Sequence, residues 1–180
     1  MTSKAIVLNL FGGPCAGKTK IMAGVFAELK FREIDCEVAP EFAKEAYWRG
    51  NFKELDDQLY VFSEQAHRTF IIKDKVEVIL TDSPLLFSLI YGKDMTDAFR
   101  ALVKEQHKIY KTVNIFLNRS GAYNGNGRFQ TEEEAIALDT QIKDMLDDND
   151  VNFVEIESNR ESLNIIADMV EDVLELYKED

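Results

Sequence analysis

Five short stretches rich in apolar residues alternate with longer amphipathic stretches along the chain. The first and the third are nearly continuous in apolar residues, as is typical of strands buried on both faces of a parallel sheet. Strands separated by helices in this way predict an α/β fold: a five-stranded parallel sheet covered by helices on both faces, with right-handed crossovers. We expect residues 1–180 to form a single domain. The five stretches are residues 5–11, 36–39, 76–81, 113–117 and 152–156.

Apolar residues recur at intervals of three and four between these strands, which predicts amphipathic helices. One helix is expected to run from residue 51 to about residue 72, with Gln65 and Arg68 on the side that faces away from the core. Its inner side is expected to consist of Leu59, Phe62, Ala66 and Phe70.

Three further features concern how helices start and where aromatic residues lie. A polar residue followed three positions later by glutamate predicts a capping box, in which the two residues satisfy each other's backbone N–H groups. We interpret the aromatic residues around position 48 as a buried cluster rather than as a stacking platform for a planar ligand. The capping pairs are Asn51 with Glu54, Thr131 with Glu134 and Ser158 with Glu161, and the aromatic residues are Tyr47, Trp48 and Phe52.

A glycine-rich loop joins the first strand to the first helix and fits the pattern G-x-x-x-x-G-K-[ST]. Glycines let backbone N–H groups turn inward on a phosphate chain, and the positive end of the following helix points at the same anion. The alternative, a glycine-rich turn with a chance lysine, is disfavoured by the strand before it and the helix after it. The residues expected to bind the phosphates are Gly12, Gly13, Pro14, Cys15, Ala16, Gly17, Lys18, Thr19 and Lys20.

Two carboxylates follow strands, where open α/β sheets place their ligands. Asp82 comes directly after residues 76–81 and is predicted to anchor Mg²⁺ together with the hydroxyl of Thr19. The alternative for Asp82 is a plain Asp-Ser-Pro turn. Glu41 follows Pro40 at the end of the second strand and is a candidate catalytic carboxylate. Its alternative role is that of a first-turn carboxylate stabilised by the helix dipole.

Residues 118–131 are rich in glycine and asparagine and too long for a tight turn. We interpret this segment as a mobile lid whose two arginines, Arg119 and Arg128, close over the phosphates. The alternative is that both are ordinary surface arginines. Gln65 could hydrogen-bond the edge of a base with its donor and its acceptor, or it could simply be solvated.

The chain carries 21 Lys and Arg residues against 33 Asp and Glu residues, a net charge of −12. This charge opposes long-range attraction to nucleic acid or to an anionic membrane, so an anionic ligand requires a local group of cations. Cys15 and Cys36 have no metal-ligand spacing and are too few for a disulfide framework. No signal peptide precedes the first strand and no apolar run reaches the ~18 residues of a membrane span. We therefore expect a soluble, cytoplasmic protein with no membrane partner.

Four segments together resemble a known family. GGPCAGKT, PEFAK, TDSPLL and FLNRSGAYNGNGRFQTEEEA occur in the order seen in small phage-encoded phosphate-loop kinases of the AAA-domain group, which are related to nicotinamide riboside kinase domains. The resemblance covers nearly the whole chain. It implies a three-layer P-loop NTPase fold with strand order 2-3-1-4-5 and, for a phage protein, the host cytoplasm as its location.

The same resemblance implies roles for individual residues. Glu41 would contact or deprotonate the acceptor hydroxyl, Gln65 and Arg68 would lie near the acceptor, and Arg119 and Arg128 would be lid cations. Some phage members of similar sequence are thought to phosphorylate 5-hydroxymethyluracil in DNA. Within the lid, residues 122–125 of this chain stand where the riboside-kinase domain has a segment that contains tryptophan. The resemblance therefore does not extend to nicotinamide riboside as acceptor.

These observations predict a kinase that uses ATP and Mg²⁺ to phosphorylate a hydroxyl of a nucleoside or nucleotide, free or within DNA. The alternative is a regulatory ATPase that keeps the phosphate loop and Asp82 but has no acceptor site. A GTPase switch is disfavoured because the chain has no Asn-Lys-x-Asp tetrad that would recognise guanine. No protein partner is evident from the sequence.

Overall fold

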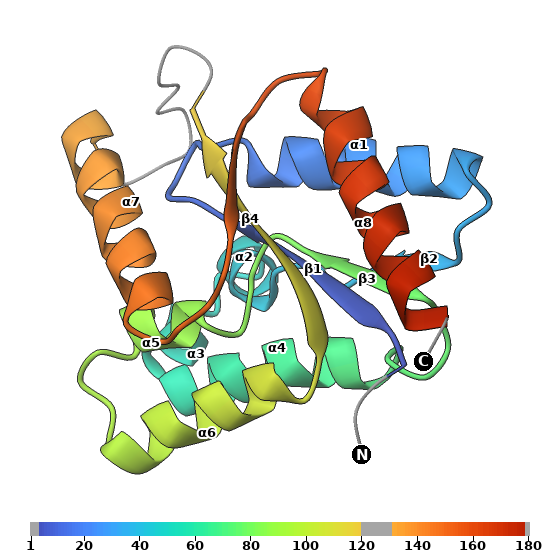
Figure 1. Ribbon diagram of the computed structural model, residues 1–180. Coiled ribbons are helices and arrows are strands. Elements are labelled where there is room, and N and C mark those ends of the chain that lie inside the picture. Colours follow the sequence, from blue (N-terminus) through green and yellow to red (C-terminus); the bar gives the residue numbers. More distant parts are fainter. Residues whose placement is uncertain (1–3, 120–130, 179–180) are drawn as a thin grey trace.

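A five-stranded, wholly parallel sheet forms the centre of the molecule (Figure 1). The computed structural model describes residues 4–119 and 131–178. The strand order is β2-β3-β1-β4-β5, which confirms the fold class and the order expected from the resemblance. The strands are β1 (Ile6–Phe11), β2 (Cys36–Val38), β3 (Val78–Thr81), β4 (Lys111–Asn118) and β5 (Val154–Glu157).

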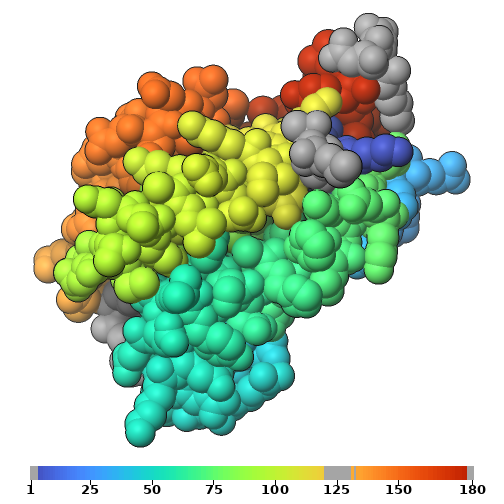
Figure 2. All heavy atoms as spheres, turned by 90° about the horizontal axis from the view of Figure 1, so that it is seen from below, coloured from blue at the N-terminus to red at the C-terminus, as the bar shows by residue number. Residues whose placement is uncertain are grey.

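Helices cover both faces of this sheet. α1 and α8 pack on one face, whereas α4, α5, α6 and α7 pack on the other (Figure 1). Seen from below, α4 and α6 lie side by side along the second face (Figure 2). The helices are α1 (Lys18–Phe31), α2 (Phe42–Trp48), α3 (Phe52–Asp56), α4 (Gln58–Phe70), α5 (Phe87–Tyr91), α6 (Asp97–Lys108), α7 (Glu132–Asp147) and α8 (Ser162–Lys178).

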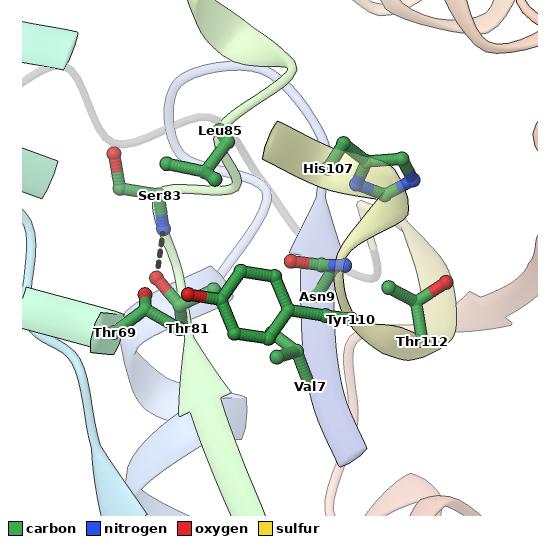
Figure 3. A pocket seen from close by; sticks show the side chains of 9 residues that line it. All are labelled: Val7, Asn9, Thr69, Thr81, Ser83, Leu85, His107, Tyr110 and Thr112. Atoms are coloured by element: carbon green, nitrogen blue, oxygen red, sulfur yellow. Dashed lines mark hydrogen bonds between the residues drawn. The ribbon is translucent and has the colours of Figure 1, made fainter. Parts of the chain in front are cut away.

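A small polar cavity of about 10 Å³ lies between the sheet and helices α4 and α6. Figure 3 shows side chains from both layers converging on it, among them Asn9 of β1, Thr69 of α4 and His107 of α6. Close to this cavity, the Asn9 side-chain amide donates a hydrogen bond of 2.9 Å to the Asn114 Oδ1, and the Asn114 Nδ2 donates to the Thr112 hydroxyl and the Asn152 carbonyl oxygen. Burial and, to a smaller extent, the charge of Lys108 together lower the pKa of His107 to about 4. His107 is therefore neutral at pH 7.

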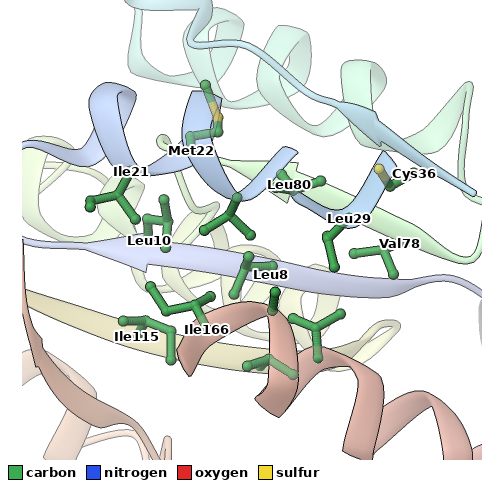
Figure 4. Packing of buried hydrophobic residues seen from close by; sticks show 14 of the residues in the cluster. Leu8, Leu10, Ile21, Met22, Leu29, Cys36, Val78, Leu80, Ile115 and Ile166 are labelled. Atoms are coloured by element: carbon green, nitrogen blue, oxygen red, sulfur yellow. The ribbon is translucent and has the colours of Figure 1, made fainter. Parts of the chain in front are cut away.

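The opposite face of the sheet is packed without polar groups of this kind. Leu8 and Leu10 of β1 meet Ile21 and Leu29 of α1 and Ile166 of α8, and each of them is almost completely buried (Figure 4). Removing one such leucine side chain would cost about 2–5 kcal/mol, because a close-packed core cannot collapse into the space left behind. The dry core holds α1, and with it the start of that helix, against the sheet.

The helix expected over residues 51–72 is in fact two helices, α3 and α4, separated at Asp57. The Asp57 carboxylate accepts a hydrogen bond from the backbone N–H of Tyr60 at 3.1 Å and so starts α4 anew. Asn51 does not cap α3 as expected, because its side-chain amide donates to the Glu54 carboxylate at 3.1 Å.

The inner face of α4 also differs from the prediction. Phe62 is buried as expected, but Leu59 and Phe70 are exposed. Gln65 and Thr69 take their places in the buried stripe, so the buried face of α4 includes polar residues.

One of the two remaining capping boxes is confirmed and the other is wrong. Thr131 and Glu134 form both hydrogen bonds of a capping box at the start of α7. The last helix starts four residues later than Ser158, at Ser162, where the Asn159 side chain accepts the Ser162 N–H at 3.0 Å. Ser158 is instead buried against the phosphate loop. The five-residue helix α5 was not predicted.

Acid should destabilise the protein through His107. Its pKa is about 4 in the folded state and about 6.5 in the unfolded chain, so between these values only the unfolded chain takes up the proton. The contribution is fully present above about pH 6.5, and about 3 kcal/mol is lost as the pH falls to 4. Urea unfolding of His107→Gln should show a weaker loss of stability between pH 7 and pH 4.5 than the wild type. The exposed His67→Gln is the matched control, and equal pH dependence of all three proteins would contradict the assignment.

Candidate phosphate-binding site

The loop between β1 and α1 needs glycine at two positions. Gly12 has a φ of 135°, and a Cβ there would lie 2.9 Å from the Ala16 Cβ and 3.1 Å from the Leu117 carbonyl oxygen. Gly17 has a φ of 88°, and its Cβ would lie 2.1 Å from the Ser158 Oγ. Because Gly17 caps α1 without a side chain, the N–H groups of the first turn have no side-chain cap. Such a helix start is suited to binding an anion.

Lys18 folds back over this loop. Its Nζ donates to the carbonyl oxygens of Gly12 at 2.6 Å and of Gly13 at 3.0 Å. Its ammonium group therefore lies at the mouth of the loop, where a phosphate chain would be neutralised. Lys20 points elsewhere, since its Nζ donates to the Ser158 carbonyl oxygen at 2.8 Å.

Thr19 and Asp82 come together as the sequence predicted. The Thr19 hydroxyl donates to Asp82 Oδ2 at 2.6 Å, and Asp82 is only 4% exposed. The register of β1 and β3, which pairs Asn9 with Thr81, places Asp82 beside the strand that leads into the loop. The second oxygen of Asp82, Oδ1, is buried and has no hydrogen-bond partner among the described residues.

The turn after β3 does not depend on the Asp82 carboxylate. The backbone N–H of Ser83 donates to the Thr81 side chain at 3.1 Å, as the dashed line in Figure 3 shows. This observation weakens the alternative in which Asp82 is merely a turn residue, because the turn is held by Thr81 instead.

The Thr19 and Asp82 oxygens fit a magnesium ion that also binds phosphate. The Thr19 hydroxyl and the two carboxylate oxygens of Asp82, of which Oδ1 is unsatisfied, are the hard oxygen donors that Mg²⁺ prefers. In the part of the chain that the structure describes, no group of three or more His, Cys, Asp or Glu side chains could hold a metal ion. The remaining ligands would therefore have to be phosphate oxygens and water, as is usual for Mg²⁺ in nucleotide sites.

Arg119 lies against the phosphate loop and pairs with α7. It follows β4, and its guanidinium pairs with Asp139 of α7 while Nη2 donates to the Pro14 carbonyl oxygen at 2.9 Å. Nη2 also donates to the Ala135 carbonyl oxygen at 3.2 Å. Arg128, the other expected lid cation, lies outside the described residues, as does most of segment 118–131.

Asp139 is a residue that sequence reasoning missed. Its Oδ1 accepts the backbone N–H of Gly13 at 2.6 Å, which links α7 to the phosphate loop across 126 positions of sequence. The available signal was an acidic residue one turn after the buried Ala135 and three before the buried Ile142, on a helix side that is otherwise apolar.

Glu41 stands at the carboxyl edge of the sheet, as expected. It is half-buried at the start of α2, and its side chain makes no capping hydrogen bond to that helix. Continuing the register of β2, β3 and β1 places its backbone two strand spacings, or about 10 Å, from the strand that enters the phosphate loop.

Gln65 and Arg68 connect α4 to α2 instead of facing solvent. Gln65 is 6% exposed, and its Oε1 accepts the backbone N–H of Phe42 at 3.0 Å, so the solvated alternative for Gln65 is wrong. Arg68 pairs with Glu45, and this hydrogen bond lowers the pKa of the Glu45 carboxyl. Both residues thus hold α2, and with it Glu41, against the sheet.

Trp48 of α2 and Phe52 of α3 are not buried, contrary to expectation. Trp48 is 75% exposed and Phe52 is 56% exposed, and each meets the Tyr47 ring edge-on. They lie on two short helices that carry no residue of the hydrophobic core beyond Phe42 and Ala46, so their outer side stays in contact with water.

Solved structures of known proteins share this fold. A crystal structure of NadR protein in complex with NR aligns with a TM-score of 0.68 at 12% identity, over 92% of this chain and 51% of that chain. This chain therefore spans about half the length of the NadR chain. A crystal structure of thymidylate kinase from Ehrlichia chaffeensis aligns with a TM-score of 0.58 at 12% identity, over 95% and 98% of the two chains. At this identity the likeness establishes a P-loop kinase-like fold.

Comparison with known sequences adds to the comparison of structures. No curated protein matches the chain. Among the described residues no helix is long and apolar enough to cross a membrane.

A family described as AAA domain matches residues 7–162, which include the phosphate loop, Glu41, Asp82 and Asp139. Because the match covers most of the sequence, the chain belongs to this AAA domain family.

Proposed function

We propose that the protein is a kinase that transfers the γ-phosphate of ATP to a hydroxyl group of a nucleoside- or nucleotide-type acceptor. The observation that carries this proposal is the hydrogen-bonded pair of Thr19 and Asp82 beside a phosphate loop that needs its glycines. The fold shared with thymidylate kinase supports it. The same arrangement would serve any nucleotide hydrolase. The carboxylate proposed to activate the acceptor hydroxyl, Glu41, distinguishes a kinase from a hydrolase.

Each residue of the site would have a distinct task in such a transfer. The first-turn N–H groups of α1 and the Lys18 ammonium would hold the phosphates, and Thr19 and Asp82 would hold Mg²⁺. Bound Mg²⁺ supplies neutralisation of the phosphate charge. Glu41 would accept the proton of the acceptor hydroxyl. The oxygen of that hydroxyl would form a bond to the γ-phosphorus of ATP while the bond between the γ-phosphorus and the leaving ADP breaks. Arg119 would neutralise charge on the transferring group.

The proposed acceptor is a class of compounds, nucleosides and nucleotides, rather than one compound. The net charge of −12 opposes approach of a polyanion, which favours a free nucleoside or nucleotide over a base within DNA. A panel of nucleosides, nucleotides and 5-hydroxymethyluracil DNA with γ-labelled ATP and Mg²⁺ would identify the acceptor. Hydrolysis of ATP with transfer to none of them would support the second candidate, a regulatory ATPase, which the phosphate loop alone would satisfy.

Replacing Lys18 by alanine should abolish turnover while leaving the fold intact. The Nζ donates to two carbonyl oxygens of the loop and lies 5.6 Å from the centre of the Phe87 ring, so its loss removes charge from the phosphate site rather than packing from the core. ATP turnover and the thermal midpoint should be compared with those of Lys104→Ala, an exposed lysine on α6. Unchanged turnover in Lys18→Ala would overturn the proposed function.

Replacing Asp82 by asparagine should impair use of the metal. The Mg²⁺ concentration needed for half-maximal rate should rise by about 10–100-fold, because one anionic oxygen beside Thr19 is lost. The measurement is a Mg²⁺ titration of the rate, repeated with Mn²⁺, with the exposed Asp144→Asn as control. A wild-type metal requirement in Asp82→Asn would exclude Asp82 as a metal anchor.

Replacing Glu41 by glutamine should separate transfer from nucleotide binding. If Glu41 takes the proton of the hydroxyl, phosphate transfer should fall by about 10²–10⁴-fold while ATP affinity stays nearly the same. Glu37→Gln, an exposed residue of β2, is the matched control. If Glu41 only stabilises the start of α2, stability should fall by about 0.3–1 kcal/mol and transfer should be unaffected.

A further inference from the structure

A group of four residues fastens the phosphate loop to the rest of the molecule. We call Gly13, Pro14, Arg119 and Asp139 the clasp. One oxygen of Asp139 accepts the Gly13 N–H at 2.6 Å, and the other pairs with the Arg119 guanidinium. The guanidinium also reaches the Pro14 carbonyl oxygen at 2.9 Å. The clasp thus joins the loop, the end of β4 and α7.

The clasp is closely packed and largely shielded from water. A Cβ at Gly13 would lie 2.8 Å from Asp139 Oδ1, 2.9 Å from the Ala135 carbonyl oxygen and 3.0 Å from Arg119 Nη2. The side chains of Arg119 and Asp139 are 15% and 19% exposed. A shielded ion pair with additional hydrogen bonds holds a guanidinium in one orientation better than an exposed pair does.

The clasp lies next to the place where the terminal phosphates would bind. The Gly13 carbonyl oxygen contacts Lys18 Nζ at 3.0 Å, so residue 13 meets Lys18 through one backbone group and Asp139 through the other. A phosphate-loop lysine reaches the β- and γ-phosphates. Arg119 is therefore a second cation at the same end of the loop, and its buried Nε has no acceptor among the described residues.

We propose that Asp139 is a positioning residue that holds Arg119 in place for phosphate transfer. This inference rests on the nucleotide site of the proposed function. A carboxylate beside the phosphate site repels the phosphates, so Asp139 is poorly suited to increasing nucleotide affinity. Its two hydrogen-bonded oxygens are suited to fixing the loop and the guanidinium relative to each other before the nucleotide binds.

Because Asp139 is negatively charged, its replacement should affect the rate of transfer and the affinity for ATP differently. Asp139→Asn keeps an oxygen that can accept the Gly13 N–H but removes the ionic hold on Arg119. The rate constant at saturating ATP should fall by about 10–100-fold, as expected for a displaced catalytic group. The dissociation constant for ATP, measured without turnover, should stay within about twofold of the wild type or decrease. Asp144→Asn on the exposed side of α7 is the matched control.

A double-mutant comparison tests whether Asp139 acts through Arg119. If it does, Asp139→Asn combined with Arg119→Ala should be no slower than Arg119→Ala alone. Losses of rate that multiply in the double variant would overturn the inference. A weakened ATP affinity with an unchanged rate in Asp139→Asn would also overturn it, since Asp139 would then only support the loop.

A second variant covers the case in which Asp139→Asn does not fold. Asp139→Glu keeps the charge but moves it by one methylene group, so the rate should again fall with ATP affinity retained. Lys18→Ala separates the two levels of inference. If Lys18→Ala leaves ATP binding and turnover unchanged, the proposed function fails. If Lys18→Ala abolishes turnover while Asp139→Asn and Asp139→Glu have wild-type rates, only the role of Asp139 fails.

Discussion

The parallel register of β2, β3 and β1 is the constraint on which the site depends. Parallel pairing brings the carboxyl ends of neighbouring strands to one edge, so the residues that follow the three strands meet there. Glu41 lies at least 21 positions after the phosphate loop and 41 positions before Asp82, yet all three follow adjacent strands. The apolar core around Leu8 and Leu10 keeps that edge in place, because the strands and α1 cannot shift without opening close-packed space.

Acidic residues outnumber basic ones in this protein, and the cations at the site are held by specific partners. The chain has a net charge of −12, yet Lys18 rests on two loop carbonyl oxygens and Arg119 pairs with Asp139. Held in this way, a cation needs little reorganisation when charge develops nearby, and this is how preorganised sites stabilise transition states. An acidic protein can therefore present a locally positive loop without a basic surface.

Buried polar side chains on the second face of the sheet perform a different task. Gln65 binds the backbone of α2, and the amides of Asn9 and Asn114 bind each other. Buried polar groups are tolerated only when they are hydrogen-bonded, so each of these contacts specifies one arrangement of helix and sheet. The mixed polar face positions α2 and Glu41, whereas the dry face supports the phosphate loop.

The sequence by itself determined the features that depend on neighbouring residues. The α/β class follows from the alternation of strands and helices. The phosphate loop follows from residues 12–19, because the glycine conformations and the start of α1 are local properties. The roles of Asp82 and Glu41 as residues that follow strands were also predictable, and the capping box at Thr131 was correct. The order of the strands was expected from a family resemblance and not from the pattern of residues.

Only the tertiary structure decided which distant residues meet. Asp139 touches Gly13 across 126 positions, and nothing local to either residue announces that contact. The burial of Gln65 likewise depends on a distant contact, because its Oε1 accepts the Phe42 N–H of α2. The break at Asp57 and the later start of α8 depend instead on local caps, in which Asp57 and Asn159 each accept a backbone N–H three positions later. Trp48 and Phe52 are exposed because they lie on the outer side of α2 and α3, which no described element covers, and hydrophobicity alone could not reveal this. Local propensities are weak energies that a few long-range contacts can outweigh, so the chain pattern specified the elements while their packing specified the site.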